Sequence, residues 1–112
     1  MSFRGQFVIP AKAGIHMHKN YYTYILASKK DGVLYIGITD NLEKRTWQHK
    51  QSLVEGFTKK YGVHYLVYFE IFDKPEDAIY REKRLKKWNR AWKIRLIEEK
   101  NPDWDDISEK FK

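Results

Sequence analysis

The sequence predicts an α+β domain in which helices flank a small three-stranded antiparallel sheet. Three segments have strand character, the first two are joined by a turn signal, and a long helical stretch follows the third. The chain has 112 residues, 42% hydrophobic and 16% aromatic, which suits one domain with a real core. We expect that domain at residues 20–112. Residues 1–19 are basic and lack acidic side chains, and we expect them to be a disordered extension.

The first two strands are expected at residues 21–27 and 33–38, which are rich in aromatic and β-branched side chains. The five residues between them end on Asp31-Gly32, a dipeptide typical of tight hairpin turns. This pattern predicts a β-hairpin.

Residues 39–41 are Thr-Asp-Asn, which are good helix caps, and they predict a helix over residues 42–53. Gly56 and Gly62 then bracket a loop. Residues 65–72 are almost continuously apolar, so we expect a third strand in a central position with both faces covered.

A single long helix is expected from about residue 73 to residue 100. Pro75 and Glu76 suit its first turn, and Pro102 would end it. A short helix is expected within residues 103–111.

The charge of the chain favours an anionic partner. Twenty-two Lys and Arg outnumber fifteen Asp and Glu, and residues 81–100 contain nine basic and three acidic side chains. Such an excess is typical of nucleic-acid binding, although a solvated basic surface is the alternative. The chain has no cysteine, no apolar run long enough to cross a membrane and no secretory signal. We expect a cytoplasmic protein.

Glu82 is the most informative candidate residue. Its spacing of three from Ile79 and from Leu85 places a carboxylate on the helix side that should face the sheet. A buried carboxylate is costly unless it has a cationic partner or a bound metal. On this pattern alone, a structural salt bridge is simpler than a metal site.

Four further residues carry weaker signals. Arg45 and His49 lie four apart on the predicted first helix and share a face, where Arg can bind phosphate and His can exchange a proton. A surface pair is the plainer alternative. Tyr24 and Tyr35 lie on the two hairpin strands, where tyrosine is also an ordinary strand residue.

Together these residues resemble the GIY-YIG nuclease superfamily, and most closely its small single-domain bacterial group. The first signature appears as Tyr22-Thr23-Tyr24 and the second as Tyr35-Ile36-Gly37, followed by Arg45, His49 and Glu82 in the family's order. The likeness covers about residues 20–100. Two departures stand out: Tyr-Thr replaces Gly-Ile in the first signature, and Ile38 stands where repair nucleases carry a lysine, which removes one candidate base.

The resemblance implies the fold expected above and a metal-dependent endonuclease that hydrolyses phosphodiester bonds in DNA, or in RNA. Glu82 would bind Mg²⁺ or Mn²⁺, Arg45 would clamp the phosphate, and Tyr24 and Tyr35 would orient water or phosphate with help from His49. Substrate contacts are expected from Gly37, Lys59, Lys86, Asn89 and Arg90. A protein partner would supply specificity. The alternative is a nucleic-acid-binding module without catalysis, which needs only the basic face.

Overall fold

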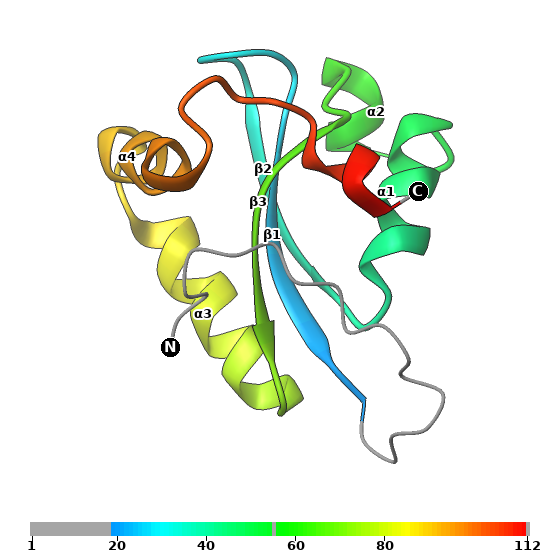
Figure 1. Ribbon diagram of the computed structural model, residues 1–112, viewed down its shortest axis with the longest axis vertical. Helices are drawn as coiled ribbons and strands as arrows, with labels where there is room; N and C mark the ends of the chain where they lie inside the picture. The colour runs from blue at the N-terminus through cyan, green and yellow to red at the C-terminus, as the bar shows by residue number, and fades with distance from the viewer. Residues whose placement is uncertain (1–18, 55, 112) are drawn as a thin grey trace.

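The computed structural model describes residues 19–54 and 56–111, and it contains one three-stranded sheet between two layers of helices (Figure 1). The strands lie in the order β2-β1-β3 and every neighbouring pair is antiparallel. Their bounds are β1 Tyr21–Ala27, β2 Leu34–Thr39 and β3 Tyr65–Phe72. The predicted α+β class and antiparallel sheet are confirmed. The extension expected at residues 1–19 lies, apart from Lys19, outside the described residues.

The β1–β2 hairpin forms where the sequence predicts it. Asp31 has a positive φ of 59°, the left-handed conformation that Asp tolerates well, and the Ser28 amide donates to the Val33 carbonyl at 3.0 Å. The turn therefore brings the two tyrosine-bearing strands side by side.

The expectation that β3 is the central strand is wrong. The central strand is β1, and β3 is an edge strand paired only with β1 among the described residues. Leu66, Val67 and Phe69 are nonetheless fully buried, because helices cover both faces of β3. A continuous apolar run indicates that other elements bury both faces of a strand, but it does not indicate whether both edges of the strand pair with neighbouring strands.

The outer edge of β3 is protected by the segment that follows the last long helix. The Asn101 side-chain amide donates to the Val67 carbonyl at 3.1 Å, and the Asp106 carboxylate accepts from the Leu66 amide at 3.2 Å. These bonds satisfy backbone groups that an open edge would leave exposed.

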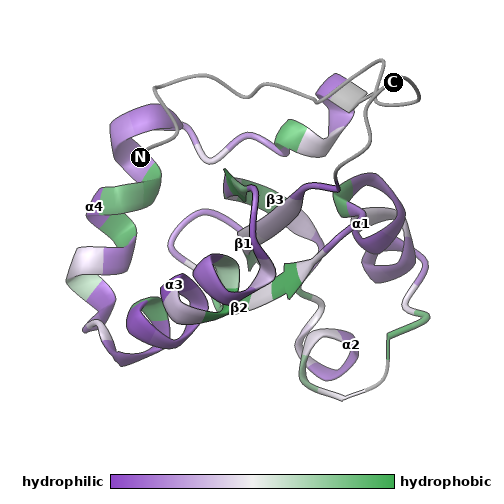
Figure 2. Cartoon of the chain, turned by 90° about the horizontal axis from the view of Figure 1, so that it is seen from below, coloured by the Kyte–Doolittle hydropathy of each residue, from purple (hydrophilic) through white to green (hydrophobic). Residues whose placement is uncertain are grey.

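Two helical groups cover the two faces of the sheet, as Figure 1 shows. One face carries α1 Leu42–Lys50, the short α2 Phe57–Tyr61 and the 3-10 helix η2 Ile107–Phe111. The other carries α3 Pro75–Lys87 and α4 Arg90–Lys100. Viewed from below, the sheet lies between α1 and α3, whose residues are largely hydrophilic (Figure 2). None of the described helices is long and apolar enough to cross a membrane.

The single helix expected from residue 73 to residue 100 is wrong, because it is two helices. Trp88 adopts an extended conformation with ψ of 150°, and Asn89 begins α4 by accepting a hydrogen bond from the Trp92 amide at 2.9 Å. Asparagine is a strong helix N-cap, and this one caps a new helix in mid-segment. The break also leaves Trp92 49% exposed.

Alternation along β1 divides the core into two clusters. Tyr22, Tyr24 and Leu26 pack beneath α1 and η2, whereas Ile25 and Ala27 pack beneath α3 and α4. Side chains along a strand point alternately to the two faces, so β1 supplies both cores.

A buried ion pair joins α3 to the sheet. The Arg81 Nε and Nη2 atoms donate to the two Glu70 carboxylate oxygens at 2.8 and 2.9 Å, and the Tyr68 hydroxyl donates to the same carboxylate. Burial would lower the pKa of Arg81, but the hydrogen bond and charge of Glu70 outweigh it and raise that pKa. Bidentate geometry fixes both the position and the rotation of α3 on the sheet.

Replacing Glu70 by Gln should therefore destabilise the fold by about 2 kcal/mol, because the partly buried Arg81 guanidinium, whose side chain is 28% exposed, would lose its anionic partner. Equilibrium urea unfolding followed by circular dichroism measures the change. The matched control is Glu76→Gln, an exposed glutamate on α3 that should change stability by less than about 0.5 kcal/mol. Equal effects of the two substitutions would contradict a stabilising role for the Glu70–Arg81 pair.

Candidate functional site

The candidate site is built around the side chain of Tyr24, which is 2% exposed on the central strand. Its cross-strand partner on β2 is Gly37. A Cβ atom at Gly37 would lie 2.7 Å from the Tyr24 hydroxyl oxygen and 2.8 Å from its Cζ atom. The sequence suggested that Gly37 lets substrate approach the backbone. In the structure, the space beside Gly37 is occupied by the Tyr24 ring.

Replacing Gly37 by Ala should destabilise the protein by about 1–3 kcal/mol, the usual cost of overpacking, because the tyrosine ring would have to move. Urea unfolding measures this. The same substitution in a Tyr24→Phe background should cost less, since the closest atom, the hydroxyl oxygen, is gone. An identical cost in both backgrounds would show that the hydroxyl group of Tyr24 is not the obstacle.

His49 lies beneath Tyr24 and links it to α2. Its Nε2 atom lies 3.3 Å from the Tyr24 hydroxyl oxygen, and its Nδ1 atom lies 3.1 Å from Thr58 Oγ1. His49 and Thr58 are only 2% and 3% exposed. The three side chains therefore form a buried hydrogen-bonded row from the sheet to α2.

The protonation states of this row follow from its burial. Burial, with smaller contributions from the charges of Arg45 and His64, lowers the pKa of His49 from 6.5 to about 4. Burial also raises the pKa of Tyr24 well above its usual value of 10. Near pH 7 the row therefore consists of neutral groups.

Tyr35, Arg45 and Glu82 lie near enough to Tyr24 for their charges to act on its pKa. Burial is the largest cause of the raised pKa of Tyr24. Of the smaller causes, the charges of Tyr35 and Glu82 raise this pKa, and the charge of Arg45 lowers it. The Tyr35 ring centroid lies 6.3 Å from that of Tyr24 and 5.7 Å from that of His49. Tyr35, Arg45 and Glu82 are all half-buried, so they are more open to solvent than Tyr24.

Arg45 and Glu82 come from opposite helical layers, whereas Tyr35 lies on β2. Arg45 projects from α1 and lines a small hollow with Thr39 and Gln48. Glu82 comes from α3 on the other side of the sheet, and its side chain is 17% exposed. The ion-pair partner of Glu82 is Lys86, one turn along the same helix at 2.8 Å.

The other residues proposed for substrate contact are more dispersed. Lys59 is exposed on α2, and Lys86 is exposed on α3. Asn89 caps α4, so its side-chain oxygen already accepts a hydrogen bond. Arg90 donates to the Asp31 and Gly32 carbonyls at 2.6 and 2.7 Å, which joins α4 to the hairpin turn.

Two residues outside the predicted set prove important to the arrangement. Thr58 touches His49, and Glu70 holds Arg81. The sequence carries a signal for Glu70, which is the only charged residue in the apolar run of β3. It carries none for Thr58, because residues nine positions apart across a loop meet only in the fold.

The donor atoms around Glu82 suit magnesium better than zinc. Among the described residues, no three His, Asp or Glu side chains are grouped to hold a metal ion. Zinc sites in proteins use three or four such ligands, whereas Mg²⁺ binds through one or two carboxylates and keeps several waters. The single carboxylate of Glu82 therefore fits a largely hydrated Mg²⁺ or Mn²⁺ ion.

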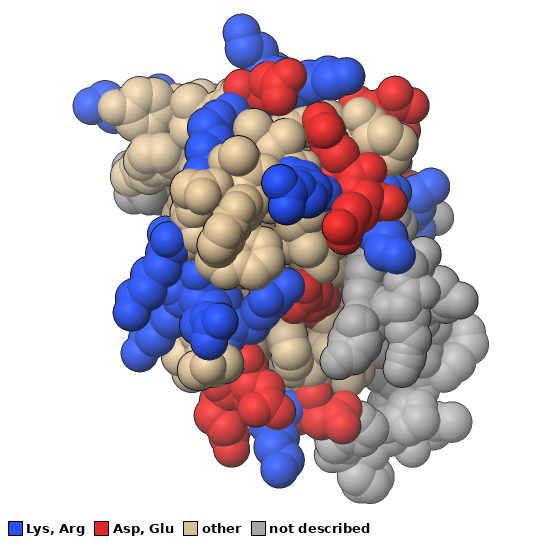
Figure 3. All heavy atoms as spheres, turned by 90° about the vertical axis from the view of Figure 1, so that its left-hand side faces the viewer, with Lys and Arg blue, Asp and Glu red and all other residues tan. Residues whose placement is uncertain are grey.

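Basic side chains gather over α3 and α4, with acidic groups towards the two ends of this face (Figure 3). We call this the basic face, and its exposed members are Lys83, Arg84, Lys86, Lys87, Arg90 and Arg95. Its charge suits contact with a phosphate backbone.

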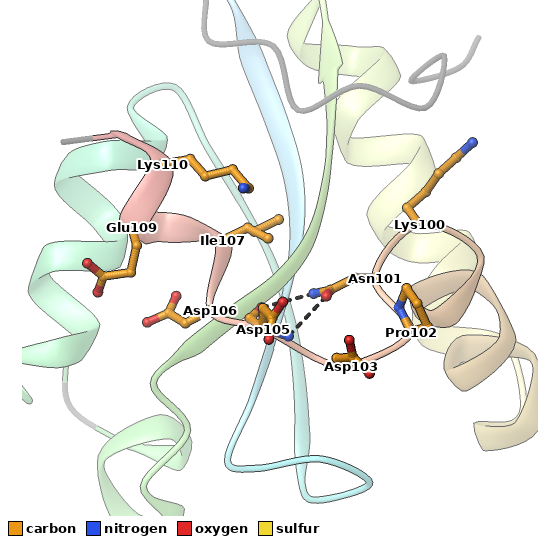
Figure 4. Close-up of a pocket in the computed structure, with 9 residues that line it drawn as sticks. All are labelled: Lys100, Asn101, Pro102, Asp103, Asp105, Asp106, Ile107, Glu109 and Lys110. Atoms are coloured by element: carbon orange, nitrogen blue, oxygen red, sulfur yellow. Dashed lines mark hydrogen bonds between the residues drawn. The ribbon is translucent and has the colours of Figure 1, made fainter.

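A separate hollow lies in the C-terminal segment, lined by residues of the range 100–110 (Figure 4). In this segment the Asp106 carboxylate binds Lys50 and accepts a hydrogen bond from the Ser108 hydroxyl, and the Asp105 backbone bonds with Asn101. The hollow shares no residue with the group around Tyr24.

The lowered pKa of His49 predicts a pH-dependent stability. The unfolded chain binds a proton on His49 below pH 6.5, whereas the folded protein does so only near pH 4. Neutral His49 therefore makes its full contribution to the free energy of unfolding above pH 6.5. This contribution, at most about 3 kcal/mol, is lost as the pH falls towards 4.

Urea unfolding of the wild type and of His49→Gln at several pH values between 7 and 4 tests this. Gln can still meet the Tyr24 hydroxyl but cannot titrate, so the difference between the two stability curves should narrow as the pH falls. Parallel curves would contradict a buried neutral His49.

Comparison with known proteins identifies the family of this chain. The family described as the GIY-YIG catalytic domain matches residues 20–95. A UPF0213 protein of Clostridium perfringens is 42% identical over 80 residues, 71% of this chain and 85% of that protein. Another, of Staphylococcus saprophyticus, is 38% identical over 79 residues, 70% of this chain and 95% of that protein.

A solved structure shares the fold. The solution NMR structure of a UPF0213 protein from Bacillus halodurans superposes with a TM-score of 0.50 at 30% identity, covering 79% of this chain and 93% of that one. The segment matched by the family, residues 20–95, includes the hairpin, α1, β3, α3 and the residues Tyr24, Tyr35, Arg45, His49 and Glu82. The chain belongs to the GIY-YIG catalytic domain family.

Proposed function

We propose that this protein is a metal-dependent endonuclease that hydrolyses phosphodiester bonds in nucleic acid, with DNA as the favoured substrate, in the cytoplasm. The observation that carries the proposal is the packing of Tyr35 against Tyr24 and His49, with Arg45 and Glu82 near enough for their charges to act on the Tyr24 hydroxyl. A phosphate clamp, a carboxylate and phenols are the parts that phosphodiester hydrolysis requires. Membership of the GIY-YIG catalytic domain family supports the same reaction.

The half-buried residues would contact the substrate. The Arg45 guanidinium stays charged at every relevant pH and presents a planar fork to phosphate oxygens. The Tyr35 hydroxyl would hydrogen-bond the phosphate or the attacking water. Glu82 would hold the divalent ion, Mg²⁺ or Mn²⁺, which when bound neutralises charge on the phosphate and the leaving oxygen.

Tyr24 would orient water as a neutral phenol. Its pKa is raised above the usual value and that of His49 is lowered to about 4, so transfer of the phenol proton to His49 is strongly unfavourable in the resting protein. A neutral hydroxyl can donate one hydrogen bond and accept others. It would hold the attacking water in position through its oxygen, with His49 supporting it from beneath.

The basic face would bind flanking phosphates and provide affinity without sequence information. Lys86 and Arg90 are its proposed contributors near the site, and Asn89 would contribute through its side-chain amide group. Lys59, on α2 in the other helical layer, would make a separate contact with the substrate. A protein partner would supply substrate selection.

A nucleic-acid-binding module without catalysis is the second candidate. The observation that favours it is the Glu82–Lys86 ion pair, which occupies the carboxylate without a metal. Exposed pairs of this kind contribute only about 0.3–0.5 kcal/mol, so a divalent cation would readily displace Lys86.

The decisive test is Glu82→Gln. Cleavage of a panel of DNA and RNA structures, with Mg²⁺ or Mn²⁺, should fall at least about 100-fold, as expected for loss of one group that stabilises the transition state. Nucleic-acid affinity should be unchanged or slightly higher, because a negative charge beside the phosphate is removed.

The free energy of unfolding of Glu82→Gln shows whether a loss of cleavage comes from the missing carboxylate or from a folding defect. Because Lys86 is 53% exposed, the Glu82→Gln variant should lose less than about 0.5 kcal/mol, and Glu76→Gln on the same helix should behave as wild type in every assay. A strongly destabilised Glu82→Gln would refute the metal-ligand role. A stable variant with wild-type cleavage would refute the nuclease mechanism described above.

A further inference from the structure

Thr58 stands at the buried end of the row that supports Tyr24. It lies on α2, which is bracketed by Gly56 and Gly62, both with positive φ. Its hydroxyl oxygen lies 3.1 Å from His49 Nδ1, and only 3% of the residue is exposed. Thr58 cannot reach a substrate directly, so any effect on the site must pass through His49.

His49 has one proton to share between two neighbours. A neutral imidazole carries its hydrogen on Nδ1 or on Nε2, and the nitrogen without it is an acceptor. Thr58 faces Nδ1 and Tyr24 faces Nε2. The position of the proton therefore sets the direction of both hydrogen bonds.

The hydroxyl groups of Tyr24 and Thr58 differ in how strongly they favour one position of the His49 hydrogen. The hydroxyl hydrogen of Tyr24 lies close to the ring plane and has few positions, whereas that of threonine rotates freely about its C–O bond to suit its surroundings. Tyr24 is 2% exposed, and His49 Nε2 is the hydrogen-bond partner of its hydroxyl within the described part of the chain, with the tautomer of His49 deciding which of the two donates. The less adaptable hydrogen therefore needs Nε2 as an acceptor.

We propose that Thr58 is a positioning residue: its hydroxyl oxygen accepts the Nδ1 hydrogen of His49, which leaves Nε2 to accept the Tyr24 hydroxyl and turns the lone pairs of Tyr24 towards the site. This arrangement lets the Tyr24 oxygen accept a hydrogen bond from the attacking water. The inference rests on the proposed nuclease function for its catalytic consequence, but the proton position on His49 is independent of that function.

The ¹⁵N NMR signals of the histidines test the proton position directly. In the wild type, His49 should show a protonated Nδ1 and an unprotonated Nε2, assigned by comparison with His49→Gln. His64, whose Nδ1 lies 2.8 Å from the His49 carbonyl oxygen, is an internal control that should keep one tautomer throughout. A wild-type His49 with its proton on Nε2 would overturn the proposal.

Two substitutions test the role of Thr58. Thr58→Val keeps the shape and removes the hydroxyl, so part of the His49 population should move its proton to Nε2. On the nuclease, kcat should fall about tenfold, the effect of one hydrogen bond, while KM stays within about twofold because Thr58 does not touch substrate. Thr58→Ser keeps the hydroxyl and should restore both the tautomer and kcat.

The outcomes remain distinguishable from failure of the proposed function. If the wild type cleaves no member of the panel, the nuclease proposal fails, and the NMR signals still decide the proton position. If Thr58→Val keeps both the wild-type tautomer and kcat, the positioning role is overturned while the nuclease stands. If Thr58→Val does not fold, two other measurements test the positioning role of Thr58: the His49 tautomer of the wild type and the kcat of Thr58→Ser. A proton on Nδ1 together with an unimpaired kcat supports the role, and any other result overturns it.

Discussion

The packing of the Tyr24 ring over Gly37 is the constraint on which the rest of the site depends. A side chain at position 37 would occupy the place of the phenol, so the glycine allows a large ring to lie flat between the central strand and α1. That position brings the hydroxyl to His49 and, through His49, to α2. The glycine of the second signature thus has a packing reason in addition to any contact with substrate.

Burial separates the residues of the site into two kinds. Tyr24, His49 and Thr58 are almost fully buried, and burial keeps Tyr24 and His49 neutral near pH 7. Tyr35, Arg45 and Glu82 are half-buried and carry the groups that suit phosphate and metal. A buried hydrogen-bonded row is the kind of support that preorganised sites require, because its bonds fix the position of the Tyr24 hydroxyl.

Two glutamates on the α3 side of the sheet have different roles. Glu70 forms a bidentate pair with Arg81 and anchors α3, whereas Glu82, the next residue after Arg81, pairs within the described residues with Lys86, which is exposed. The anchor fixes the rotation of α3 and therefore the direction in which Glu82 projects. The salt bridge that the sequence suggested for Glu82 does form, with Lys86 on the same helix, and the more buried carboxylate pair is that of Glu70 on β3 with Arg81.

The sequence by itself determined the class of the fold, the strand and turn positions and the residues of the candidate site, because these follow from local periodicity, turn chemistry and an ordered motif. Only the tertiary structure decided that β1 is the central strand, that Asn89 divides the long helix, that Glu70 is the partner of Arg81 and that Thr58 supports His49. Each of these depends on which segments meet across the sheet. Strand order and the partner of a buried polar group are set by packing between segments distant in the chain, and no local pattern encodes that packing.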